Sequence, residues 1–241
     1  MRRFFAAPGQ FTEHVVTLSQ EETRHLRDVL RLKTGDEVQV FDGEGREFLC
    51  EIMEIRREGT SLRVIRETEP VAAESPLDLR LAVSFYKSDK LDLVIQKAVE
   101  LGVSRLSLLV TARSEIKFHD AGKRTERFQK IAMEATKQCE RAKVMQVDEP
   151  STFENFMSDI DGSAGLLLMF SEKGGGSIPS PGENKKITAL IGPKGGWDDT
   201  EIESAVGRGF VPVKLGRRIM RAETAAITFA ALLQHRFGDL N

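Results

Sequence analysis

Hydrophobic and polar residues follow one pattern up to about residue 70 and a different one beyond residue 76. Upstream, short segments with β-branched and aromatic residues partly alternate with polar residues, and turns that contain glycine separate them. This pattern predicts a small β-barrel or sandwich. Its segments are 37–43, 46–55 and 61–67.

One helix is expected to interrupt these strands, at residues 19–32. Ser19 and Glu22 have the spacing of a capping box, which closes the first turn of a helix by reciprocal hydrogen bonds. The apolar side of this helix would be formed by Leu26, Val29 and Leu30.

Beyond residue 76, continuous apolar segments alternate with helical ones. Buried strands joined by helical crossovers are typical of a parallel sheet. The sequence therefore predicts an α/β domain whose parallel sheet is covered by helices on both faces. The expected strands are 79–85, 105–111, 164–170, 186–192 and 211–216, and the expected helices are 88–101, 125–141, 198–208 and 223–236.

The stretch TEPVAAESP, at 68–76, separates the two patterns. Its two prolines stand among small and acidic residues, as is usual in a linker. We therefore expect two domains, 1–70 and 76–241, which are built on different plans and show no internal repeat.

Composition narrows the class of protein. The 241 residues, 40% of them hydrophobic, can bury the cores of two modest domains. No stretch approaches the roughly 18 to 20 apolar residues of a membrane span, and the first residues lack the apolar length of a signal peptide, so we expect a cytoplasmic protein with no membrane contact. Two cysteines and four dispersed histidines predict no metal site. The net charge of −2 means that nucleic-acid binding would need cations gathered on one face.

A glycine-rich loop, GPKGG at 192–196, directly follows an apolar strand. Glycines there let a ligand lie against bare backbone groups. The spacing fits neither the dinucleotide-binding nor the Walker motif. The next helix begins with Asp198, Asp199 and Glu201, which would repel a phosphate at its N-terminus. A neutral or cationic ligand is favoured, although a turn without any ligand stays open.

A second loop, KLGRRIMRA at 214–222, connects a short strand to the last expected helix. From 225 to 233 that helix is apolar on nearly every side, so we expect its own domain and a second subunit to cover it. Arg221 stands at the entrance of this buried helix. Arg217 and Arg218 fit equally well in a solvated loop.

Cations also recur along two expected helices at separations of three, four or seven residues, which places each set on one side of its helix. Such rows suit phosphate contacts, which position a nucleic acid without reading its sequence. A solvated helix face is the alternative. The rows are Arg24, Arg27 and Arg31, and Lys130, Lys137 and Arg141.

Six motifs, in order over nearly the whole chain, carry a resemblance to a known family. They are HLRDVLRLKTGDEVQVFDG (25–43), QKAVELGV (96–103), KQCER (137–141), LIGPKGG (190–196), LGRRIMRAETAA (215–226) and RFGDL (236–240). With them the chain resembles the bacterial rRNA methyltransferases that methylate N3 of a uridine in 16S rRNA of the small ribosomal subunit, the RsmE family of the SPOUT superfamily.

The resemblance implies a PUA-like β-barrel followed by a SPOUT α/β domain with a deep trefoil knot near the C-terminus. It also implies a homodimer whose S-adenosylmethionine sites lie in the knotted loops near the subunit interface. The adenine would be enclosed by Leu215, Gly216, Ile219 and Met220. The full set of implied cofactor-binding residues is Leu168, Phe170, Ile191, Gly192, Pro193, Lys194, Gly195, Gly196, Leu215, Gly216, Ile219, Met220, Thr224 and Ala225.

This chain departs from the family pattern at three positions. Lys194 replaces a usual Glu, and its ammonium is expected to point outward, away from a sulfonium ligand. Lys137 replaces an acid, and Ala222 replaces a frequent Thr. We expect the fold and the site to tolerate the last two changes.

The implied reaction requires uridine N3 to lose its proton. A cation aimed at the resulting charge would lower the pKa of the nucleoside and stabilise the transition state, and Arg221 is the candidate. Glu223 could accept the proton or only start the last helix. The 16S rRNA, free or in the small subunit, would contact both domains. The candidate RNA-binding residues are Arg24, Arg27, Arg31, Lys87, Arg113 and Arg141.

Three other functions stay open from the residues. The chain could be another SPOUT-type RNA methyltransferase, a nucleotide enzyme that handles phosphate, or a non-catalytic RNA-binding protein. Binding of ATP or GTP without S-adenosylmethionine would favour the second, and RNA binding with neither ligand the third.

Overall fold

The computed structural model describes residues 2–84, 88–114, 124–160, 165–180, 182 and 185–240. They form two compact units. The first contains Met1–Glu74 together with Thr136–Val144, and the second contains Ser75–Ala135 and Met145–Asn241. The first unit is therefore completed by a segment from the middle of the chain.

The first unit is built on a five-stranded sheet in the order β1-β3-β4-β5-β2. Strand β1 runs parallel to β3, and the other neighbours are antiparallel. Alternate residues such as Val38 and Val40 are fully buried in the core, as a sheet with one covered face requires. The strands are β1 (Arg3–Phe5), β2 (Val15–Leu18), β3 (Glu37–Phe41), β4 (Glu47–Ile55) and β5 (Thr60–Thr68), with a short 3₁₀ turn η1 (Pro8–Gln10) after β1.

The helix expected at 19–32 is shorter than predicted. Ser19 caps α1 (Gln20–Arg24) by accepting the Glu22 N–H at 3.3 Å, but the chain then enters a π-helical turn, η2 (His25–Val29). There the Leu30 N–H reaches the His25 carbonyl, five residues back, at 3.0 Å. This wider turn rotates the following side chains, so Val29, expected in the core, is 64% exposed.

The second unit contains a seven-stranded sheet in which every paired neighbour is parallel, which confirms the predicted sheet. Six strands follow the order β12-β10-β11-β6-β7-β8, and β9 pairs with β7. The strands are β6 (Asp78–Ser84), β7 (Arg105–Val110), β8 (Gln146–Val147), β9 (Ser151–Thr152), β10 (Leu166–Phe170), β11 (Lys186–Ile191) and β12 (Val211–Val213).

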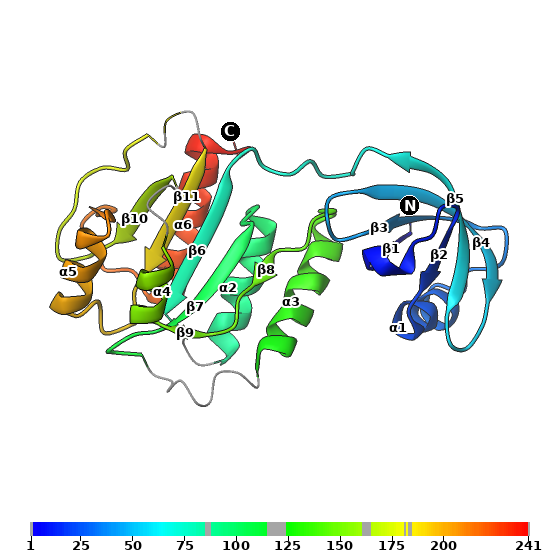
Figure 1. Cartoon of the computed structure of the whole chain (residues 1–241), viewed down its shortest axis with the longest axis horizontal. Helices are drawn as coiled ribbons and strands as arrows, with labels where there is room; N and C mark the ends of the chain where they lie inside the picture. Colours follow the sequence, from blue (N-terminus) through cyan, green and yellow to red (C-terminus); the bar gives the residue numbers. More distant parts are fainter. Residues whose placement is uncertain are drawn as a thin grey trace. The chain divides into compact units, whose positions relative to one another are not determined.

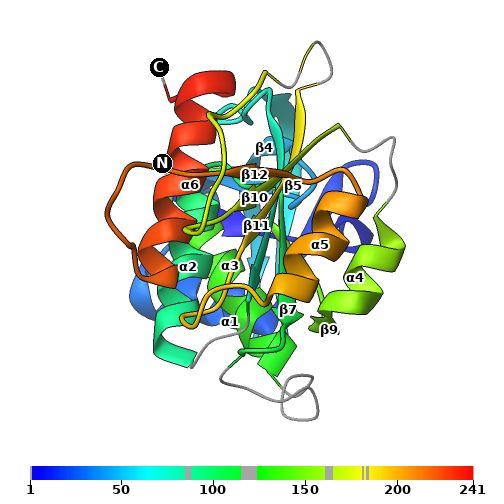
Figure 2. The same cartoon turned by 90° about the vertical axis from the view of Figure 1, so that its left-hand side faces the viewer.

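Helices cover both faces of this sheet. In Figures 1 and 2, α2 and α6 lie together on one face, and α4 and α5 lie on the other. The second face packs through a core that includes Phe153, Trp197 and Phe210. The helices are α2 (Ser88–Glu100), α3 (Thr125–Gln138), α4 (Phe153–Asp159), α5 (Asp199–Gly207) and α6 (Ala222–Phe237). Strands β8 and β9 and helix α4 were not expected from the sequence.

The topology brings three loops to one edge of the sheet. Strands β10, β11 and β12 are parallel neighbours, with β10 between the other two. They end at Phe170, Ile191 and Val213, and each is followed by a loop. In open parallel sheets ligands bind outside the carboxyl ends of the strands. The candidate site is therefore expected where these loops meet.

Candidate active site at the carboxyl edge of the sheet

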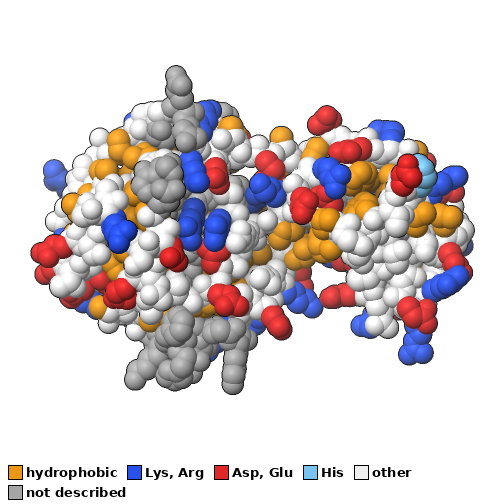
Figure 3. All heavy atoms as spheres, in the orientation of Figure 1, with side chains coloured by type: hydrophobic (Ala, Val, Ile, Leu, Met, Phe, Trp, Pro, Cys, Tyr) orange, Lys and Arg blue, Asp and Glu red, His pale blue; other side chains and the backbone are white. Residues whose placement is uncertain are grey.

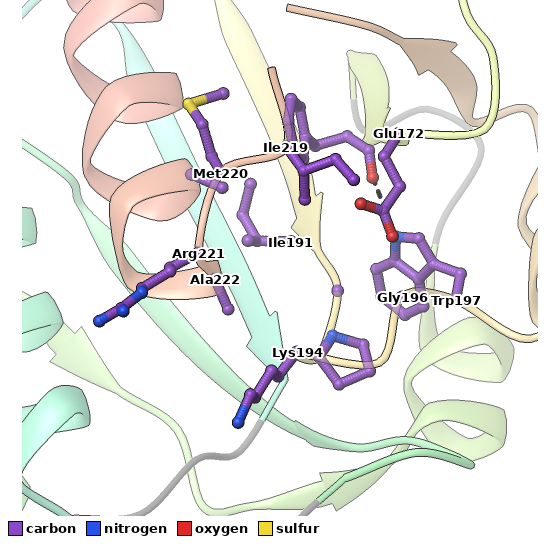
Figure 4. Close-up of a pocket in the computed structure, with 13 residues that line it drawn as sticks. Glu172, Ile191, Lys194, Gly196, Trp197, Ile219, Met220, Arg221 and Ala222 are labelled. Atoms are coloured by element: carbon purple, nitrogen blue, oxygen red, sulfur yellow. Dashed lines mark hydrogen bonds between the residues drawn. The ribbon is translucent and has the colours of Figure 1, made fainter. Parts of the chain in front are cut away.

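A cavity of about 660 Å³ lies where the loops after β10, β11 and β12 meet (Figure 4). A second cavity, of about 700 Å³, adjoins it along the loop after β12. The first is lined by Phe170, Glu172, Ile191, Gly192, Pro193, Lys194, Gly196, Trp197, Ile219, Met220, Arg221, Ala222 and Ala225. The second is lined by Phe170, Ser171, Glu172, Lys173 and the loop residues 214–220.

The first cavity is largely apolar and rests on a fixed aromatic ring. The Trp197 indole is buried, and its Nε1–H donates to the Phe170 carbonyl at 2.9 Å, which ties the loop after β11 to the end of β10. A Cβ on Gly192 would lie 2.9 Å from that ring, so glycine lets the backbone pack closely against it. Ile191 and Ala225 add further buried apolar surface.

Arg113 holds the glycine-rich loop in place. Its guanidinium donates to the carbonyls of Gly195 (3.1 Å) and Trp197 (3.3 Å) and pairs with Asp198 at 3.0 Å. Asp198 caps α5, and hydrogen bonds from Thr200 together with Arg113 lower the pKa of its carboxyl. The capping box predicted between Asp198 and Glu201 is confirmed.

Two cations stand at the rim of the cavity. Figure 4 shows the side chains of Lys194 and Arg221 extending from it on the same side, and both residues are exposed. Lys194 therefore points outward, as expected. Arg221 is the N-cap of α6, and its carbonyl accepts the Ala225 N–H at 2.8 Å. The helix start fixes its backbone while its guanidinium faces solvent.

Glu223 is paired rather than free. Its carboxylate lies 2.9 Å from the Lys90 ammonium and is 15% exposed. Burial alone would raise the pKa of Glu223, but the Lys90 hydrogen bond and the neighbouring charges lower it below its ordinary value. A carboxylate with a lowered pKa is a weak proton acceptor at neutral pH.

Most residues predicted to bind the cofactor line one of the two cavities. Three do not: Leu168 is buried within β10, Gly195 offers its carbonyl to Arg113, and Thr224 is exposed on α6. The sequence reasoning missed Glu172 and Trp197. Trp197 directly follows the glycine-rich loop, and its position there was the available signal. Glu172 has no such signal in the sequence, and only its position in the lining of both cavities identifies it as a candidate functional residue.

The predicted RNA-binding residues are dispersed. Arg141 is only 5% exposed and pairs with Glu74 at 2.6 Å, so its guanidinium does not face RNA in this structure. Helix α3 ends at Gln138, and Glu140 at φ 66° turns the chain, which breaks the expected row. Arg31, at φ 56°, likewise lies beyond α1 and η2.

The other predicted RNA-binding residues differ from one another in their surroundings. Arg24 and Arg27 are exposed, Arg27 pairs with Asp28 at 2.7 Å, and Arg113 holds the glycine-rich loop. Lys87 lies outside the described residues. On the face shown in Figure 3, Lys and Arg side chains are interspersed with Asp and Glu.

Comparison with known proteins decides the family. A model of the RNA methyltransferase domain matches residues 73–234, and a model of the RNA methyltransferase PUA domain matches residues 18–65. Ribosomal RNA small subunit methyltransferase E of Synechocystis is 34% identical, with 92% of this chain and 74% of the relative covered. The Bacillus subtilis protein of the same name is 32% identical, with 94% and 93% covered.

A solved structure is similar over the full length of both chains. The ribosomal RNA small subunit methyltransferase E of Neisseria gonorrhoeae, bound to S-adenosyl methionine, has a TM-score of 0.89 and 29% identity and covers 100% of each chain. This chain belongs to the ribosomal RNA small subunit methyltransferase E family. The resemblance read from the six motifs is confirmed, and so is the α/β fold with an N-terminal PUA domain.

Membership makes the chain an rRNA methyltransferase of the small-subunit type that uses S-adenosylmethionine. In the part of the chain that the structure describes, no helix is long and apolar enough to cross a membrane. No group of three or more His, Cys, Asp and Glu side chains within the described ranges could hold a metal ion.

Proposed function

We propose that this protein transfers the methyl group of S-adenosylmethionine to N3 of a uridine in 16S rRNA, with the cofactor in the two adjoining cavities. The observation that carries the proposal is the convergence of three loops on an apolar cavity with cations at its rim. The residues fit the cofactor, because buried apolar surface suits the adenine and glycine backbone suits its polar edge. The two cations in the lining, Lys194 and Arg221, are exposed and therefore do not place a buried positive charge beside the sulfonium.

The cofactor, when bound, supplies an electrophilic methyl group on a sulfonium. The apolar walls from Ile219, Met220 and Ala225, and the backbone of 191–196, would hold it. Leu215 and Gly216, in the second cavity, would complete the adenine site. Leu168, Gly195 and Thr224 line neither cavity, so we assign them no direct contact with the cofactor.

Arg221 is the residue we assign to the substrate. It lines the first cavity at its rim, where α6 begins, and its exposed side chain can meet a base that enters from solvent. Loss of the N3 proton leaves negative charge shared with O2 and O4 of the uracil. A guanidinium directed at that charge lowers the pKa of the nucleoside and stabilises the transition state.

Glu223 is better suited to hold the start of α6 than to accept the proton. It is tied to Lys90 and lies in the first turn of the helix, where an acid is favourable. We therefore propose that Glu223 fixes α6, and with it the backbone of Arg221. The proton acceptor would be another group or water.

RNA binding would rest on fewer residues than the sequence indicated. Arg24, Arg27 and Arg31 of the first unit remain candidates for phosphate contacts, joined by Lys194 at the rim. The buried, paired Arg141 would serve the first unit itself, and Arg113 would act through the glycine-rich loop.

A homodimer is supported by apolar surface around the site. Ile219 is 81% exposed, and Leu232 on α6 is 38% exposed. A second copy of the chain would cover this surface. The trefoil knot, the domain limits 1–70 and 76–241 and the cytoplasmic location stay predictions of the family resemblance and the sequence.

The test is transfer of labelled methyl from S-adenosylmethionine to RNA by the full-length protein. Small-subunit rRNA, or the small subunit itself, should be labelled far more than large-subunit rRNA of equal amount. Equal labelling of both would contradict the proposed substrate. Binding of small-subunit rRNA without any transfer would instead support a non-catalytic RNA-binding protein.

A further inference from the structure

Glu172 is an acid at the junction of the two cavities. It follows β10 by two residues and lines both of them. Figure 4 shows its carboxylate between Ile219 and Trp197, directed toward the space of the first cavity. Nothing in the activity proposed above uses this group.

The donors around this carboxylate are already engaged. Trp197 Nε1–H donates to the Phe170 carbonyl, the Gly196 N–H donates to the Pro193 carbonyl at 2.9 Å, and Lys173 pairs with Asp199 at 2.6 Å. No hydrogen bond or ion pair of the Glu172 side chain is found within the described residues. Its oxygens are therefore available to a ligand.

Gly196 leaves room for the Glu172 carboxylate because it has no side chain. The residue has φ 70°, and a Cβ there would lie 2.7 Å from Glu172 Oε1. A larger residue at this position would require the carboxylate to move. The glycine thus permits both the turn and the close approach of an acid to bare backbone.

We propose that Glu172 binds the ribose of the cofactor by accepting hydrogen bonds from its two hydroxyls. This inference rests on the proposed function. In S-adenosylmethionine the ribose lies between the adenine and the methionine portion, so a group at the junction of two cavities meets the ribose. An ionised carboxylate accepts two O–H donors at once, and acids bind ribose hydroxyls in other nucleotide sites.

The competing interpretation is attraction of the Glu172 carboxylate to the cofactor's cationic methionine portion. Three ligands separate the two: S-adenosylmethionine, 5′-methylthioadenosine, which keeps the ribose but lacks the amino acid, and 2′,3′-dideoxyadenosine, which lacks both hydroxyls. Affinities are measured by calorimetry on the full-length protein. The variants are Glu172→Gln and Glu172→Ala, with Glu203→Gln, an exposed acid on α5, as the matched control.

Both Glu172 variants should bind S-adenosylmethionine and 5′-methylthioadenosine roughly 10-fold more weakly or worse, because charged hydrogen bonds are lost. Their affinity for 2′,3′-dideoxyadenosine should equal that of the unmodified protein, and Glu203→Gln should change nothing. Unaltered thermal unfolding of Glu172→Gln would show that the loss is local.

Weaker binding of S-adenosylmethionine alone, with 5′-methylthioadenosine unaffected, would overturn the inference in favour of the methionine portion. Unchanged affinity for all three ligands would overturn it as well. Binding of 5′-methylthioadenosine that depends on Glu172, without methyl transfer to any RNA, would support the ribose site and contradict only the proposed function.

Discussion

Arg221 and Lys194 share the rim of the cavity, but they are held differently. Arg221 is the N-cap of α6, whereas Lys194 is an exposed residue of the glycine-rich loop. A cation that must meet charge developing on one base is most effective when its backbone is fixed before the substrate arrives. Arg221 meets that condition.

The variant Arg221→Ala should lower kcat for methyl transfer by about 100-fold or more, because a preorganised charge donor is lost. The Kd for S-adenosylmethionine should stay within about twofold, because the Arg221 side chain is exposed at the rim and extends away from the apolar walls. Arg208→Ala, at the end of α5, is the matched control. Near-normal turnover of Arg221→Ala in a single-turnover assay would remove it from the mechanism.

Glu223 gives a prediction in pH. Because its folded-state pKa is below the ordinary value of 4.5, the pair with Lys90 stabilises the folded protein above about pH 4.5. This contribution is lost as the pH falls through the folded-state pKa. In urea unfolding, Glu223→Gln should cost about 0.5 to 1 kcal/mol at pH 7. The difference should shrink as the pH falls below about 4.5 and through the lowered folded-state pKa of Glu223, and Lys90→Met should cost nothing further in the Gln background.

The same variant separates the two roles of Glu223 in activity. If Glu223 only fixes the helix start, Glu223→Gln should keep more than a tenth of the rate, and its pH–rate profile should keep the same shape. A loss of more than 100-fold together with a missing acidic limb would instead make Glu223 the general base.

The loop after β11 is an element whose shape depends on one side chain from the loop after β7. Arg113 donates to two of its carbonyls and pairs with Asp198. Arg113→Ala should therefore weaken S-adenosylmethionine binding by roughly 3- to 10-fold, as expected when a binding loop loses preorganisation. If Arg113 bound RNA instead, RNA affinity would fall and cofactor affinity would not. Parallel titrations with both ligands distinguish the two.

Sequence periodicity predicted the elements of the larger sheet well because their signals are local. The helices expected at 88–101, 198–208 and 223–236 correspond to α2, α5 and α6 within one residue at each end. The π-turn at η2 was not predictable, because its pattern of apolar residues is the same as that of an α-helix. It moved Val29 out of the core.

The fate of Arg141 shows a different limit. Its spacing from Lys137 is that of a helical row, but α3 ends before it, and the segment Thr136–Val144 belongs to the first unit. There Arg141 meets Glu74, and its carbonyl accepts from Arg3 at 2.7 Å. Partners 67 and 138 residues away in sequence leave no local signal. The sequence pattern therefore predicted a row of exposed cations, whereas in the structure Arg141 belongs to a buried ion pair.

At the scale of the whole molecule, the motifs predicted which loops meet, but they did not predict which charged side chains line the cavity. The glycine-rich loop and the KLGRRIMRA loop were placed together through family resemblance, and the structure brings them to one cavity. Glu172 was identified only from the strand order in the structure, which places the end of β10 between those of β11 and β12. An acid after an apolar strand has no distinguishing pattern by itself.

Oligomeric state is testable through α6. Light scattering of the purified chain should give twice the 26.9 kDa of one chain. Leu232→Glu, which places a charge in the exposed apolar surface of α6, should shift the protein to the monomer. Val206→Glu, at a comparably exposed apolar position on α5, should leave the dimer intact. A monomeric unmodified protein would contradict the dimer outright.

The central claim is that the cavity serves methylation of N3 of uridine. Small-subunit rRNA labelled by the protein with S-adenosylmethionine is digested to nucleosides and separated by liquid chromatography with mass detection. The label should appear as 3-methyluridine and accumulate about 100-fold or more slowly when Arg221→Ala is used. Label in any other methylated nucleoside would contradict the assigned chemistry of the site.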